Sequence, residues 1–116
     1  MSGRIELERE FLLEKISRIN PEDRDFADKA NKIGSMVQTF ACPLREDREM
    51  AILPYPRQYA CFKNAIRASE NGQVRDAWWE ICDFVTASKE KDMTFMEMWL
   101  LSMMFEFFAD CCRRQK

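Results

Sequence analysis

The segment from Met93 to Cys112 constrains the fold more than any other part of the chain. It opens with Thr94-Phe95-Met96-Glu97, which is typical of a capping box in which Thr94 is the N-cap and Glu97 reaches back to it. Beyond this start, apolar side chains cover most of the expected helix surface. The remaining polar stripe consists of Ser102, Glu106, Asp110 and Arg113. A helix with this pattern is either the central helix of a bundle or an interface helix.

Four more segments have the periodicity of amphipathic helices. We expect helices over residues 4–19, 21–40, 56–71 and 73–88, and a last one from Phe95 to about Cys112. Asn20 is the expected N-cap of the second helix, with Pro21 as its first residue. Asn71-Gly72 is the expected end of the third helix. Residues 42–56 are expected to be irregular or to hold one short helix at 44–53.

Composition supports an all-α fold. Only 3 Gly and 4 Pro occur in 116 residues, whereas an all-β fold needs many turn residues. Hydrophobic residues make up 47% of the chain, which is enough for a core at a length typical of one domain. The sequence therefore predicts one domain over residues 1–116, a compact antiparallel bundle of four to five helices with a hydrophobic C-terminal helix.

The helix over 56–71 has two contrasting faces. Its expected inner face consists of Tyr59, Phe62, Ala65, Ile66 and Ser69, and its expected outer face is basic. Arg57, Lys63 and Arg67 on that outer face, near aromatic rings, are the ingredients of a single-stranded nucleic-acid site. The net charge of −2 lacks the overall basic signature of such proteins. An RNA- or DNA-binding module is therefore an alternative hypothesis.

Three aromatic residues fall outside the expected core. Phe95 and Trp99 lie on the polar side of the last helix, and Trp79 points away from the apolar seam of the preceding helix. Aromatic residues are enriched at the centres of protein interfaces. The sequence therefore predicts that Trp79, Phe95 and Trp99 form a partner-binding patch, covered by another protein or by a second copy in a homodimer.

Residues that could carry chemistry are few. The chain has no histidine, which excludes triads and histidine–metal sites, and its cysteines lack zinc spacing, so we expect no catalytic residue, metal or cofactor. Two acidic pairs, Glu46/Glu49 and Glu80/Asp83, have the spacing ExxE…ExxD. This pattern resembles the all-α nucleoside triphosphate pyrophosphohydrolases of the MazG and dimeric dUTPase type. The resemblance implies a Mg²⁺-dependent enzyme as a second alternative, whereas the residues alone favour a solvated acidic face.

The five cysteines indicate the compartment. Their number is odd, no CxxC occurs, and the charged N-terminal residues do not look like a signal peptide, so reduced thiols in the cytoplasm or nucleus are expected. Acidic residues in the most apolar segment predict no membrane span. The leading hypothesis is a small intracellular adaptor or regulatory protein, of the kind of a viral accessory or inhibitor protein, that acts through protein–protein contacts.

Overall fold

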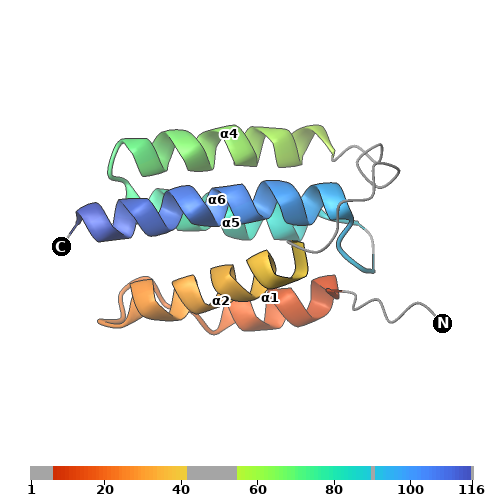
Figure 1. Ribbon diagram of the computed structural model, residues 1–116, viewed down its shortest axis with the longest axis horizontal. Helices are drawn as coiled ribbons and strands as arrows, with labels where there is room; N and C mark the ends of the chain where they lie inside the picture. Colours follow the sequence, from red (N-terminus) through yellow and green to blue (C-terminus); the bar gives the residue numbers. More distant parts are fainter. Residues whose placement is uncertain (1–6, 42–54, 90, 116) are drawn as a thin grey trace.

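The computed structural model describes residues 7–41, 55–89 and 91–115 (Figure 1). Within these ranges the chain forms helices α1 (Arg9–Ser17), α2 (Phe26–Ala41), α4 (Pro56–Glu70), α5 (Val74–Ala87) and α6 (Phe95–Arg114). The predicted short helix at 44–53 lies outside the described residues. No strand occurs in the described ranges, where Glu8 and Asp92 form an isolated antiparallel bridge. The predicted all-α class is confirmed.

Capping interactions fix several helix ends at the predicted positions. The Thr94 hydroxyl accepts the Glu97 N–H at 3.1 Å, and Glu97 Oε1 accepts the Thr94 N–H at 2.8 Å, so the capping box starts α6 as predicted. The end of α4 is followed by Gly72, whose φ of 74° lies in the left-handed region that glycine adopts without strain. Helix α5 agrees with its predicted range to within one residue at each end.

Two predicted helix starts are wrong. Helix α1 begins only at Arg9, because the residues before it pair with the segment that precedes α6: the Met93 N–H donates to the Leu7 carbonyl at 2.8 Å. Helix α2 begins at Phe26 rather than Pro21. The Asn20 side chain accepts the Glu22 N–H at 3.0 Å, and the Asn20 carbonyl accepts the Asp23 N–H at 2.9 Å. Asn20 therefore forms a turn. Asparagine is favoured both in turns and at N-caps, so the two structures compete for this residue.

The helices form an antiparallel bundle around a central pair. Consecutive described helices run in opposite directions along the bundle (Figure 1). Helix α6 contacts α2, α4 and α5, and α5 contacts α1, α4 and α6, so these two lie at the centre. The buried cluster draws residues from all five helices. Helices α4 and α6 are parallel neighbours, because both run antiparallel to α5.

An aromatic cluster fills the middle of the core. The ring of Trp78 in α5 lies 5.8 Å from those of Phe26 and Phe108 and 6.2 Å from that of Phe105, measured between ring centroids. Trp78 and Phe108 are fully buried. Gly34 lets α2 approach this cluster closely, since a Cβ at Gly34 would lie 2.7 Å from an atom of the Phe105 ring. The cluster thus joins α2, α5 and α6.

Candidate functional site

The buried face of α4 differs from the predicted one. Its buried residues are Gln58, Cys61, Ala65, Ala68 and Ser69, so α4 packs on the bundle mainly through small side chains. Tyr59, Phe62 and Ile66 were expected inside and are only partly buried. Small residues let α4 lie close to α5, and this packing turns the larger apolar side chains toward the α6 side.

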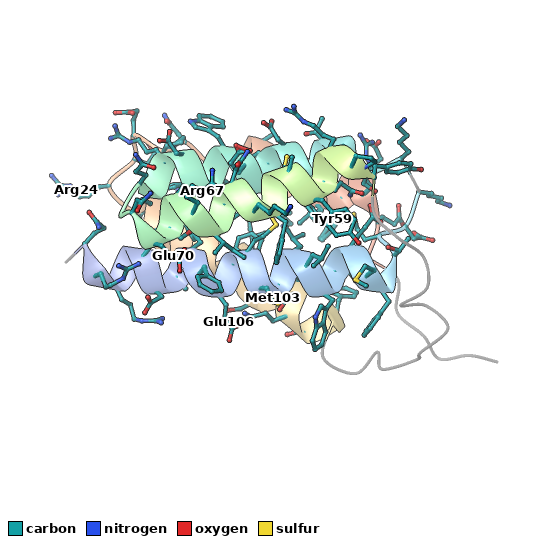
Figure 2. The ribbon with its side chains drawn as sticks, turned by 90° about the horizontal axis from the view of Figure 1, so that it is seen from above. Arg24, Tyr59, Arg67, Glu70, Met103 and Glu106 are labelled. Carbon is teal, nitrogen blue, oxygen red and sulfur yellow. The ribbon has the colours of Figure 1, made fainter. Side chains whose placement is uncertain are left out.

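Helix α6 adds apolar side chains to the same side. Trp99 and Phe107 are 40% and 39% exposed, and Met96 and Met103 are partly buried. On the helical projection Met96, Met103 and Phe107 lie between the solvent side of α6 and the side that contacts α4, and Trp99 lies beside Met103 at the middle of the solvent side. Tyr59 and Met103 are labelled on the two neighbouring helices in Figure 2. We call this surface the α4–α6 face; it consists of Tyr59, Phe62, Ile66, Met96, Trp99, Met103 and Phe107.

A buried polar bridge holds α4 and α6 side by side. Gln58 donates from Nε2 to Glu97 Oε2 at 2.6 Å, and its Oε1 accepts the Tyr55 N–H at 2.9 Å. Both side chains of the bridge are buried, at 0% exposed for Gln58 and 2% for Glu97. At the other end of the helix pair, Arg114 donates to the Ser69 carbonyl at 2.8 Å. The α4–α6 face therefore lies on a scaffold fixed at both ends.

Charged residues of both signs border the α4–α6 face. Exposed Lys63, Arg67 and Glu70 lie along α4, and exposed Asp110 lies along α6. Asp110 pairs with Arg114 at 3.2 Å. Among the described residues, Lys63, Arg67 and Glu70 form no ion pair. These three charges are thus available to a partner that covers the face.

The three predicted partner-binding residues are not brought together. Trp99 is 40% exposed and Trp79 is 53% exposed, but Phe95 is buried at 2%, which corrects the expectation that it lies at the surface. The Phe95 ring packs beside Trp99, one turn further along α6, with ring centroids 6.1 Å apart. Phe95 thus supports Trp99 from below the surface.

The two exposed tryptophans lie on different surfaces. Trp99 and Phe108 are about two and a half turns apart and therefore on opposite sides of α6. Phe108 packs against Trp78 of α5, with ring centroids 5.8 Å apart. Trp99 thus points away from α5, the helix that carries Trp79. No single patch contains both tryptophans.

The predicted basic surface is partly neutralised. Arg57 lies 3.4 Å from Asp83 of α5 in an exposed ion pair, while Lys63 and Arg67 lie further along α4. Of the predicted acidic pairs, Glu46 and Glu49 lie outside the described residues. The nucleic-acid and pyrophosphohydrolase hypotheses therefore stay predictions.

Cys61 lies beside the predicted acidic pair Glu80/Asp83, a neighbour that the sequence did not predict. The Cys61 Sγ atom and one carboxylate oxygen each of Glu80 and Asp83 lie within 4.8 Å of one another. Burial, and then the charge of Glu80, raise the pKa of the Cys61 thiol to about 11, and burial raises that of Cys82 to about 12. Both thiols are protonated at neutral pH and are poor nucleophiles, since the thiolate is the reactive form.

A second surface feature lies on the other side of α6. A groove of about 480 Å³ runs between α2 and α6. The residues that line it are Asn31, Gly34, Ser35 and Gln38 from α2, and Phe105, Glu106, Ala109 and Arg113 from α6. Its size falls within the range of ligand pockets, but its lining is mostly small and polar, whereas such pockets are predominantly apolar. The α4–α6 face is the stronger candidate.

Comparison with known protein families, curated proteins and solved structures finds no match to this chain. In the part of the chain that the structure describes, no helix is both long and apolar enough to cross a membrane. Fold and surface together define an all-α helical bundle with an exposed apolar face. Sequence reasoning identified Trp99 but missed Gln58, although its place at the third position of a helix that opens with Pro56 is a capping-box signal.

Proposed function

We propose that the protein is a small protein-binding module, an adaptor, regulator or inhibitor, that acts through the α4–α6 face. One observation carries the proposal: α4 and α6 bury small or medium side chains between them and leave a row of large apolar ones at the surface. Monomeric proteins rarely expose large contiguous apolar patches, and larger ones mark interaction sites. Trp99 and the methionines beside it are residue types that protein-binding surfaces favour.

The proposal favours a protein partner over the two alternatives. A nucleic-acid site uses a positively charged groove with stacking rings, but Arg57 is paired with Asp83, and Arg113 and Arg114 of α6 are paired with Asp110. Among the described residues, only Cys61 joins Glu80 and Asp83 in an acidic or thiol cluster. Among the described cysteines, Cys61, Cys82 and Cys111 are free thiols, which supports a reducing compartment, the cytoplasm or nucleus.

Affinity capture with matched variants tests the proposal. The double variant Trp99→Ser/Phe107→Ser removes two exposed anchors of the α4–α6 face, and Trp79→Ser removes a more exposed ring from another surface. Loss of one interface anchor typically costs about 2 kcal/mol, or about 30-fold in affinity. We expect quantitative mass spectrometry to find proteins that are captured by the wild type and by Trp79→Ser and lost from the double variant.

Two results would contradict the proposal. The first is a set of captured proteins that the double variant retains, with circular dichroism showing that all three chains are folded. The second is capture that nuclease treatment abolishes, which would indicate nucleic acid as the partner.

A further inference from the structure

A sulfur atom and two carboxylates converge where α4 packs on α5. Glu80 and Asp83 lie about one turn apart on α5, and Cys61 reaches them from α4. The three ligand atoms, Cys61 Sγ and one carboxylate oxygen of each acid, lie within 4.8 Å of one another. None of these residues belongs to the α4–α6 face, so the cluster is separate from the surface of the proposed function.

Cys61 points into the cluster from its buried side. The residue is 1% exposed, and among the described residues its thiol has no hydrogen-bond partner outside the cluster, where it pairs with Glu80. The Arg57 guanidinium lies 3.4 Å from Asp83 Oδ2 and offsets one of the two carboxylate charges. The remaining negative charge beside a buried sulfur atom favours a further cation.

The donor atoms indicate which cation suits the cluster. Thiolate sulfur binds zinc, whereas Mg²⁺ and Ca²⁺ take oxygen ligands. Zinc bonds are about 2.3 Å to sulfur and about 2.0–2.2 Å to carboxylate oxygen, so the ligand atoms of a tetrahedral ion lie about 3.5 Å apart. Rotation of the Glu80 side chain, which is partly buried, and of the Asp83 side chain, which is exposed, brings the three atoms to that spacing.

We propose that Cys61, Glu80 and Asp83 form a zinc site that links α4 to α5, with its fourth position open to water. On binding, the Cys61 S–H bond breaks, its proton passes to solvent, and the sulfur electron pair forms the bond to the ion. The divalent ion and the Arg57 guanidinium then balance the charges of one thiolate and two carboxylates. The exposed Asp83 side chain provides the path of the ion from solvent.

Titration of the reduced, metal-free full chain with Co²⁺ tests the proposal, because a thiolate bond to Co²⁺ gives a charge-transfer absorption band. We expect one Co²⁺ per chain, displaced by zinc. Cys61→Ser should lose the band, whereas Cys82→Ser removes a thiol of α5 outside the cluster and should retain it. Glu80→Gln and Asp83→Asn should each weaken zinc binding by about tenfold or more, since loss even of a group that only orients a ligand costs about 10–100-fold.

Thermal unfolding gives a second measurement. An ion that binds the folded state raises the melting temperature. Zinc should therefore raise the melting temperature of the wild type and of Cys82→Ser, and should leave those of Cys61→Ser and Glu80→Gln unchanged. Mg²⁺ should leave the wild type unchanged.

Several outcomes would overturn the proposal. A wild type that gives no band with millimolar Co²⁺ has no such site, and a band that persists in Cys61→Ser places the ion on other cysteines. Stabilisation by Mg²⁺ without a cobalt band would mean that the acidic pair binds a cation without the thiol. If Cys61→Ser does not fold, unchanged zinc affinity in both Glu80→Gln and Asp83→Asn contradicts the site. Capture of proteins through the α4–α6 face is decided separately from all of these results.

Discussion

Replacement of Trp78 by alanine is expected to lower the free energy of unfolding by about 3–5 kcal/mol, the range for deletion of a large buried aromatic side chain. Trp78 is fully buried, with 0% of its surface exposed, and its ring contacts rings from α2 and α6. The cavity would therefore open where three helices meet. Equilibrium unfolding in urea, followed by circular dichroism, measures the change.

Two matched variants show whether the effect comes from this cavity. Trp79→Ala removes the neighbouring ring, which is 53% exposed, and should change stability by no more than about 0.5 kcal/mol. Trp78→Phe keeps a ring in the core and removes an indole N–H that has no hydrogen-bond partner among the described residues. It should therefore cost less than Trp78→Ala. Equal losses for Trp78→Ala and Trp79→Ala would contradict the placement of Trp78 at the centre of the core.

Replacement of Glu97 by alanine is expected to cost about 2–4 kcal/mol, because hydrogen bonds to a charged group contribute about 1.5–3 kcal/mol and unpaired buried donors add a penalty. The Glu97 carboxylate accepts the Thr94 N–H at 2.8 Å and the Gln58 amide at 2.6 Å. Its removal opens the capping box of α6 and leaves the buried Nε2 of Gln58 with only the 3.4 Å hydrogen bond to the Phe84 carbonyl. Thermal unfolding compared with the wild type measures the loss.

Glu106→Ala is the control for Glu97→Ala, since Glu106 is an exposed acid on the same helix. At protein concentrations low enough to avoid association, it should change stability by no more than about 0.5 kcal/mol. If Glu106→Ala lowered the free energy of unfolding as much as Glu97→Ala, the effect would come from loss of a negative charge on α6 and not from the buried hydrogen bonds. A neutral Glu97→Ala would mean that the Gln58–Glu97 bridge does not hold α4 to α6.

The helices could be predicted from the sequence because their signals are local. The capping box at Thr94 and the glycine after α4 act through neighbouring backbone groups, so their effect does not depend on the rest of the fold. The start of α2 was wrong because Asn20 is equally suited to an N-cap and to a turn. The start of α1 depends on pairing with residues 91–93, a long-range contact that no local pattern reveals.

The α4–α6 face could be predicted only in part. Periodicity assigns the largest apolar side chains to the core, and this rule misplaced Tyr59, Phe62 and Ile66. Close packing of α4 on α5 instead favours the small side chains of Ala65 and Ala68, a choice that depends on the distance between two helices. Phe95 was misplaced because it is the first residue of α6, where its ring packs onto Trp99 and is covered despite its polar helical phase.

Photo-crosslinking from the α4–α6 face in cells tests directly whether a protein covers this face. A benzophenone amino acid placed at Met103 reports contacts at the centre of the face, and the same residue placed at Trp79 reports an exposed position on another surface. We expect discrete crosslinked protein adducts from position 103 and none, or only weak and diffuse ones, from position 79. Absence of adducts from position 103, or the same adducts from both positions, would contradict a binding role for the α4–α6 face.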